Sequence, residues 1–178
     1  RRVPAPFIPE YEGLQTVRVV LGPQDDHFTA RGVQTFLSGE YRVTGDADRM
    51  GCRLDGPAIE HRPGMTEIVS DGVPWGAIQV PGHGQPIVLL ADRQTTGGYP
   101  KIAGVISVDL WRLAQVKPGD VLRFRAVPRS EAHRLYRLHG AQFASLRRQL
   151  ETNIFRGKEY RLLIGGRWHR VWVEKAGP

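Results

Sequence analysis

The residues best suited to chemistry stand close together in a polar segment, residues 92–101, that follows a short apolar run. The run, residues 86–91, is rich in Ile, Val and Leu, which predicts a buried strand. Loops that follow rigid strands are common positions for sites, because the strand fixes the geometry and the loop supplies the functional groups. The alternative is a solvated hairpin end in which Gly97 and Gly98 only turn the chain. The segment carries seven polar side chains: Asp92, Arg93, Gln94, Thr95, Thr96, Tyr99 and Lys101.

A second polar segment, residues 45–51, is rich in turn-forming residues and holds an acid beside a base, Asp48 and Arg49. This pair either serves a site or forms a local salt bridge that braces the turn. Asp46 and Asp48 have the alternate spacing of a calcium loop, but no acid follows at the later positions that such a loop needs. The histidines also lack metal-ligand spacing, so we predict no metal site.

Other signatures of self-sufficient catalysis are missing from the sequence. Gly97-Gly98 leads into Tyr99-Pro100, which cannot begin the helix that a phosphate-binding loop needs. No serine lies in a nucleophile elbow. The residues alone therefore predict a polar site on a β loop without a complete catalytic constellation.

The elements that must position these residues are many short strands separated by turn residues. This pattern predicts a mainly β domain, a closed barrel or a sandwich, over residues 14–128, after a proline-rich linker at 1–13. We expect short helices at residues 27–37, capped by Asp26, and 110–115, capped by Asp109. The expected strands cover residues 16–21, 41–44, 53–54, 66–70, 76–80, 86–91, 102–108 and 121–127.

The C-terminal part is predicted to hold one longer helix, 129–150, and a basic β-hairpin tail, 151–178. Ser130 is the expected cap of the helix. A two-residue turn at Gly165-Gly166 predicts the hairpin. The apolar stripe of the helix consists of Leu135, Leu138, Phe143, Leu146 and Leu150. The apolar face of the hairpin consists of Tyr160, Leu162, Ile164, Val171 and Val173.

Composition is typical of a globular protein, with 178 residues, 40% of them hydrophobic and 24% charged. No apolar stretch approaches the roughly 20 residues that span a bilayer. The single cysteine, Cys52, rules out an internal disulfide and fits a reducing compartment, so we expect a cytoplasmic protein.

The net charge of +7 belongs to the C-terminal third. Residues 1–122 hold 12 Lys+Arg against 14 Asp+Glu, a net −2, whereas residues 123–178 hold 13 against 4, a net +9. Such a basic segment could bind nucleic acid, but more often it solvates a helix or an edge strand.

Four ordered segments resemble the C-terminal half of the biotin-dependent carboxyltransferase family. They are GPQDDHF at residues 22–28, DRMGCRLDG at 48–56, GVPWGAIQVP at 72–81 and GQPIVLLADRQTTGGYPK at 84–101. The family includes KipA, allophanate hydrolase subunit 2, the 5-oxoprolinase C subunit and the carboxyltransferase region of urea carboxylase. The N-terminal half of such proteins has no counterpart here, so we expect a piece of a longer protein.

The resemblance implies a cyclophilin-like β-barrel and a subunit of an ATP-dependent 5-oxoprolinase, which opens 5-oxoproline to glutamate. It also implies a KipI-like partner and a third subunit, with ATP bound by a partner subunit. Small amides or lactams are the implied substrates, so Arg93 and Lys101 would stabilise negative charge and Tyr99 would orient the amide. Residue type and loop position give the candidate substrate-binding residues Asp48, Arg49, Gln79, Asp92, Gln94, Thr95 and Thr96.

Two other functions stay open at this point. The chain could belong to a biotin-dependent urea or amide carboxylase, in which case biotin would be a cofactor. It could instead be a non-enzymatic regulator that binds a KipI-like inhibitor of a histidine kinase.

Overall fold

The computed structural model describes residues 14–152 and 158–173, which form two compact units, one ending at His139 and the other beginning at Gly140. The predicted linker, residues 1–13, lies outside the described residues, as do residues 153–157 and 174–178 of the predicted tail. Within the described ranges, no helix is both long and apolar enough to cross a membrane.

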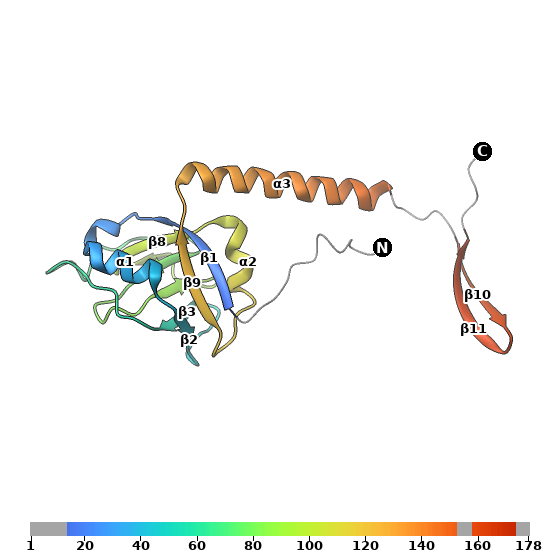
Figure 1. The fold of residues 1–178 in the computed structure, drawn as a ribbon, viewed down its shortest axis with the longest axis horizontal. Helices are drawn as coiled ribbons and strands as arrows, with labels where there is room; N and C mark the ends of the chain where they lie inside the picture. Colours follow the sequence, from blue (N-terminus) through green and yellow to red (C-terminus); the bar gives the residue numbers. More distant parts are fainter. Residues whose placement is uncertain (1–13, 153–157, 174–178) are drawn as a thin grey trace. The chain divides into compact units, whose positions relative to one another are not determined.

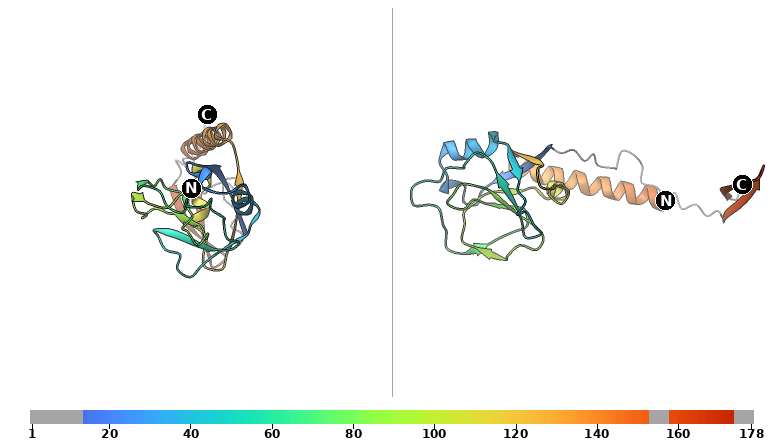
Figure 2. Two further views of the ribbon diagram at one scale, coloured as in Figure 1. Left: turned by 90° about the vertical axis from the view of Figure 1, so that its left-hand side faces the viewer. Right: turned by 90° about the horizontal axis from the view of Figure 1, so that it is seen from below.

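The first unit is a closed barrel of seven strands, in the order β1-β8-β5-β6-β3-β2-β9 (Figures 1 and 2). The barrel closes because β1 pairs antiparallel with β8 and parallel with β9, so neither side of β1 is left as an open edge. The predicted closed β-barrel is confirmed. Its strands are β1 (Leu14–Leu21), β2 (Tyr41–Val43), β3 (Gly51–Asp55), β5 (Ala77–Gln79), β6 (Ile87–Leu89), β8 (Lys101–Val105) and β9 (Val121–Ala126).

Alternating apolar residues of these strands fill the barrel, and helix α1 (Ala30–Ser38) adds an aromatic side chain to them. Phe36 of α1 stacks on Phe124 of β9, with ring centroids 4.7 Å apart, and also packs against Tyr41 of β2. All three rings are fully buried, and burial raises the pKa of Tyr41 to about 12. Large aromatic groups therefore join α1 to two barrel strands.

The predicted N-terminus of the first helix is wrong. Asp25–His27 forms a separate 3-10 turn, η2, and α1 begins only after Thr29, whose Oγ1 accepts a hydrogen bond from the Gly32 amide at 2.9 Å. Between the two helices Phe28 is extended and bridges to His61. Burial of Phe28 in the core thus interrupts the helix that Asp26 was expected to cap.

Replacing Gly32 by alanine should lower the free energy of unfolding by about 2 kcal/mol. A Cβ atom at Gly32 would lie 2.2 Å from the carbonyl oxygen of Glu60, which is backbone and cannot turn aside. Gly140→Ala is the matched control, because a Cβ there would meet nothing within 4 Å. In denaturant titrations the control should be neutral or stabilised by up to about 1 kcal/mol, and equal changes in the two variants would contradict the predicted clash.

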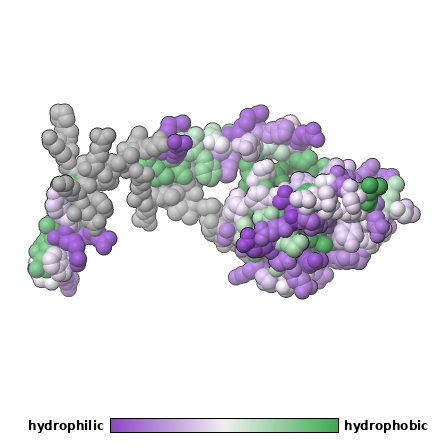
Figure 3. Space-filling model, turned by 180° about the vertical axis from the view of Figure 1, so that it is seen from behind, coloured by the Kyte–Doolittle hydropathy of each residue, from purple (hydrophilic) through white to green (hydrophobic). Residues whose placement is uncertain are grey.

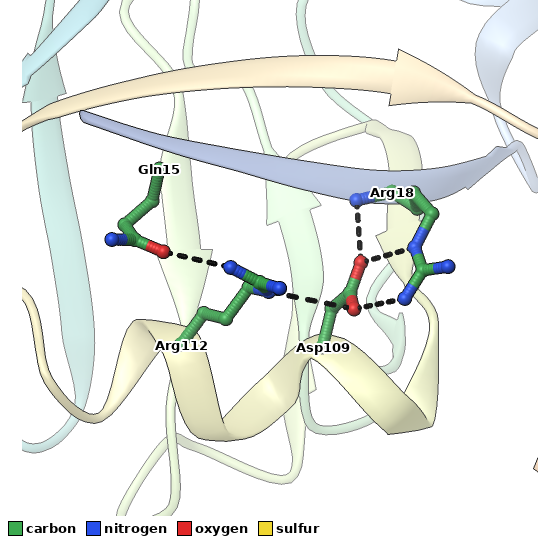
Figure 4. Close-up of polar contacts among 4 residues, drawn as sticks. All are labelled: Gln15, Arg18, Asp109 and Arg112. Atoms are coloured by element: carbon green, nitrogen blue, oxygen red, sulfur yellow. Dashed lines mark hydrogen bonds and ion pairs between the residues drawn. The ribbon is translucent and has the colours of Figure 1, made fainter. Parts of the chain in front are cut away.

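Asp109 is the N-cap residue of the short helix α2 (Leu110–Leu113), as predicted, but its side chain makes no capping hydrogen bond and instead holds the helix to the barrel. Its carboxylate is 1% exposed and accepts three hydrogen bonds from Arg18 of β1, from the backbone amide and two guanidinium nitrogens, at 2.6–2.9 Å (Figure 4). Arg112 lies 3.7 Å from the same carboxylate and donates to Gln15. The hydrogen bond with Asp109 raises the pKa of Arg18. The segment that enters α2, η3 (Ser107–Asp109), is therefore fixed by charge.

A small second sheet of two strands forms separately from the barrel, and it differs from the prediction. Residues 66–70, expected as a strand, are not one, whereas strand β4 (Asp71–Gly72) pairs with β7 (Thr96–Gly97) inside the segment predicted to be a loop. Residues 66–70 offer no buried face, since Val69 is 93% exposed. Lys101, assigned to the loop, is instead the first residue of β8.

The long helix α3 (Arg129–Thr152) begins one residue before Ser130, so Ser130 lies inside it and is not its cap. Ala132 and Leu135 pack against a small cluster of Ile106, Val108 and Val127 on the barrel. Farther along the predicted apolar stripe, Leu138 and Phe143 are exposed.

The second unit contains the predicted hairpin, β10 (Lys158–Ile164) and β11 (Arg167–Val173). The register pairs Tyr160 with Val171, and both turn glycines, Gly165 and Gly166, have positive φ. On the other face Arg161 lies over the ring of Trp168, 5.2 Å from its centroid. Hydrophobic and hydrophilic side chains lie side by side on the hairpin surface (Figure 3).

Candidate functional site on the outer face of the barrel

The candidate site lies on the outer face of strands β3, β6, β5 and β8. Cys52, Val88, Ile78 and Ile102 belong to the barrel core. Because side chains alternate along a strand, the residues next to them point away from the core. These outward residues include Arg53, Ile87, Leu89, Gln79 and Lys101, and the last two are partners in the pairing of β5 with β8.

A polar hollow of about 320 Å³ opens on this face. It brings together four of the predicted site residues, which come from three separate segments of the sequence. It also contains Arg53 of β3 and His83 of the turn after β5, which were not predicted as site residues, although Arg53 lies within one of the four segments that carry the resemblance. The hollow is lined by Asp48, Met50, Gly51, Arg53, Gln79, Pro81, His83, Ile87, Leu89, Gln94 and Tyr99.

Gln79 forms the buried polar part of this hollow, with only 2% of the residue exposed. Its Nε2 donates to the backbone carbonyl of Tyr99 at 3.2 Å, and its Oε1 accepts from Gln94 Nε2 at 3.4 Å. A Cβ atom at Gly97 would lie 2.7 Å from Gln79 Nε2, so glycine lets the loop lie directly on this amide. Gly97 therefore does more than turn the chain.

Lys101 is the most buried charged group of the site, with 1% of the residue exposed. Its Nζ donates to Asp71 Oδ2 at 2.9 Å, and Gln24 Nε2 lies 3.5 Å from the same oxygen. Hydrogen bonding to Lys101, then to the Gly72 amide, lowers the pKa of Asp71. Asp71 and Gln24 were not predicted as site residues, and only the pairing of β4 with β7 brings Asp71 to Lys101.

Arg93 anchors the polar loop in this structure. Its Nε donates to the carbonyl of Val73 at 2.9 Å, and its Nη1 lies 3.4 Å from the carbonyls of Leu90 and Ala91. The catalytic role predicted for Arg93 stays a prediction. Thr95 and Thr96 are exposed, Thr96 within β7.

The Asp48 and Arg49 side chains do not pair with each other. Arg49 Nε instead lies 2.8 Å from Asp92 Oδ2, in an exposed ion pair that joins the two polar loops. Asp48 Oδ1 accepts hydrogen bonds from the backbone amides of Met50 and Gly51, at 2.8 and 3.0 Å. These backbone hydrogen bonds lower the pKa of Asp48, and the bond from Gly51 has the larger effect.

The Asp48 carboxyl should titrate at a pKa below the ordinary aspartate value of 3.8. A carboxyl with a depressed folded pKa stabilises its loop above the unfolded pKa, and this stabilisation is lost as the pH falls through the folded pKa. In an NMR titration, the amide signals of Met50 and Gly51 should therefore shift with the same acid midpoint as the Asp48 carboxyl. Asp48→Asn is the control, because it has no carboxyl to protonate at this position, so both amide signals should stay in place over the same pH range.

A second, mainly apolar hollow of about 370 Å³ shares Asp48 with the first. Cys52 lies at this hollow, and burial raises the pKa of its thiol to about 12, so the thiol is protonated at neutral pH. Among the described residues no group of three or more His, Cys, Asp or Glu side chains could hold a metal ion. The apolar hollow is lined by Ala47, Asp48, Arg49, Cys52, Trp75, Leu90, Ala91, Leu110, Leu113, Ala114, Val116 and Pro118.

The sequence matches a known family along most of its length. The model of the carboxyltransferase domain, subdomain A and B, matches residues 1–126. The chain belongs to this family. The resemblance seen in the four sequence segments is thus confirmed, and its relatives include proteins named as enzymes or enzyme subunits.

A 5-oxoprolinase C subunit of Haemophilus influenzae is 39% identical over 132 residues, which are 74% of this chain and 42% of that protein. A putative urea carboxylase of Emericella nidulans is 30% identical over 133 residues, 70% of this chain and 11% of that protein. The chain therefore spans less than half the length of either relative.

Two solved structures agree with the observed fold. TTHA0988 is 38% identical and has a TM-score of 0.57, covering 66% of this chain and 22% of that one. The urea carboxylase of Kluyveromyces lactis has a TM-score of 0.75, covering 81% of this chain and 14% of that one, and at 22% identity this likeness concerns the fold alone.

Proposed function

We propose that this chain is part of a subunit that acts in the ATP-dependent opening of 5-oxoproline to glutamate, as in the proteins named as C subunits of 5-oxoprolinase. The polar hollow supports this proposal most directly, because it places the buried Gln79 amide beside exposed polar groups on a rigid barrel face. A planar lactam needs such donors and acceptors to be oriented. The identity of 39% to the Haemophilus influenzae protein supports the choice of substrate.

The residues of the site take the following proposed roles. Lys101 supplies the positive charge next to the hollow, and Tyr99, Gln94 and Asp48 contact the lactam. Arg93 positions the loop through backbone carbonyls rather than contacting substrate. Asp92 and Arg49 join the two loops, and Thr95 and Thr96 lie at the exposed edge.

The proposed assembly includes a KipI-like partner and a third subunit, with ATP bound by a partner. The test is glutamate formation from 5-oxoproline and ATP by the complete protein with its partner subunits. We expect turnover that stops when this subunit is omitted. Turnover that continues without it would overturn the proposal.

A second candidate is carboxyl transfer to urea or another amide, with biotin as the carboxyl carrier. The 30% identity to a putative urea carboxylase favours it as the alternative. In that case the complete protein should consume bicarbonate and ATP in the presence of urea, and 5-oxoproline should not stimulate ATP hydrolysis.

A non-enzymatic role, in which the barrel binds a KipI-like inhibitor of a histidine kinase, is the remaining proposal. It predicts tight binding to the partner without turnover of either substrate.

A further inference from the structure

Lys101 and Asp71 form an ion pair of very unequal burial. The Lys101 side chain is 2% exposed, whereas the Asp71 side chain is 55% exposed. A buried ammonium needs a compensating charge, because it has lost its hydration. That charge comes here from a side chain that is still half in water, on the two-residue strand β4.

The carboxylate position beside Lys101 is prepared by groups other than Asp71. Gln24 Nε2 points at the same oxygen, 3.5 Å away, and Gln24 Oε1 is held by the backbone amide of Lys101 at 3.1 Å. The backbone of Gln24 also donates to the Lys101 carbonyl at 3.1 Å. The Gln24 amide is therefore held by the Lys101 backbone and keeps its position when the Asp71 carboxylate leaves, while burial confines the Lys101 side chain.

The Asp71 carboxylate can give up this position when another carboxylate takes its place, because the exchange keeps the buried ammonium paired. Rotation of a half-exposed aspartate side chain brings its carboxylate into water and leaves β4 paired with β7 through the backbone. The residue next to Lys101 in the barrel pairing is Gln79, which lines the polar hollow. A ligand with its amide in the hollow thus has a buried cation close to one end.

We propose that Lys101 and Gln24 form a carboxylate-binding site that Asp71 occupies in the absence of ligand and yields to a substrate carboxylate. The inference rests on the proposed function, since 5-oxoproline carries both a lactam and a carboxylate. Asp71 acts as an internal competitor, which keeps the buried ammonium paired and selects against neutral amides. Urea, which has no carboxylate, gains nothing from this site.

The test compares a charged and a neutral ligand of the same shape, 5-oxoproline and 5-oxoprolinamide, by calorimetry on the complete protein. The wild type should bind the acid about tenfold more tightly than the amide. Asp71→Asn should bind the acid several-fold more tightly than the wild type, because the competing charge is gone, with the affinity for the amide unchanged. Lys101→Met should bind both ligands equally.

Glu67→Gln is the matched control, because it removes one negative charge from the same exposed segment without touching Lys101. It should leave both affinities at wild-type values. If Lys101→Met does not fold, Asp71→Ser provides a second variant that removes the competing carboxylate. It should also bind the acid more tightly than the wild type. If neither Asp71 variant tightens binding of the acid, or if Glu67→Gln tightens it equally, the proposed competition is wrong.

Acetate and acetamide separate this inference from the proposed function. NMR titration with millimolar acetate should shift the Lys101 and Gln24 signals more strongly in Asp71→Asn than in the wild type, and acetamide should not. If acetate binding depends on Asp71 but 5-oxoproline is not turned over, the carboxylate-binding site is supported and the proposed function is wrong. If 5-oxoproline is turned over but acetate binding does not depend on Asp71, the proposed function is supported and the carboxylate-binding site is wrong.

Discussion

Replacing Asp109 by asparagine should lower the free energy of unfolding by about 3 kcal/mol, the largest stability effect that we expect from a single polar substitution. The Asp109 carboxylate accepts three hydrogen bonds from Arg18 and is 1% exposed, so its loss leaves donors of Arg18 without a charged acceptor. The ion pair also joins β1 to the segment that enters α2, through two residues that are 91 positions apart in the sequence (Figure 4). Denaturant unfolding of the purified protein measures the loss.

Glu40→Gln is the control for Asp109→Asn. Glu40 pairs with Arg123, and both side chains are about half exposed, so the loss should stay below about 1 kcal/mol. Salt separates the two pairs further, because about 0.5 M salt should weaken an exposed pair more than a buried one. An equal loss in both variants would show that the Asp109 network does not hold α2.

Under the proposed function, replacing Gln79 by leucine should lower turnover of 5-oxoproline about 100-fold, the largest effect on activity that we expect within the polar hollow. The Gln79 amide holds the carbonyl of Tyr99 and the side chain of Gln94, and both groups line the hollow. Leucine has a similar size but no hydrogen-bonding group, so the barrel core should persist while these two groups lose their fixed positions. Steady-state assays on the assembled complex measure the effect.

Gln34→Leu, on the exposed face of α1, is the matched control for Gln79→Leu. It should leave turnover within about twofold of the wild type. Circular dichroism should show the same fold for both variants. Wild-type turnover in a folded Gln79→Leu protein would remove the polar hollow from the reaction and leave the apolar hollow as the next candidate.

The strands and the barrel class follow from the sequence because local patterns specify them. Short runs of Val, Ile and Leu predict β1, β6 and β8 closely, and the alternation of apolar residues with arginine predicts β9. The hairpin at Gly165-Gly166 follows for a similar reason, because a two-residue turn with positive φ at both positions favours glycine. The family also follows from sequence alone, through four segments in the correct order.

Helix ends and the roles of single side chains depended on tertiary contacts. Asp26 and Asp109 both occupy positions typical of helix caps, but burial of Phe28 displaces the first helix and Arg18 takes the Asp109 carboxylate. Which of these interactions forms depends on residues far away in the sequence, so local propensity could not decide it.

The sequence by itself predicted a candidate site in a polar segment after a buried strand, with Lys101 and Gln79 among the candidate residues. Only the tertiary structure decided that Lys101 is buried, that Arg93 anchors backbone carbonyls and that Asp71 supplies the countercharge. The physical reason is the pairing of β4 with β7, two strands of two residues each, which no hydrophobic pattern reveals. Short strands held by backbone hydrogen bonds thus place the charges of this site.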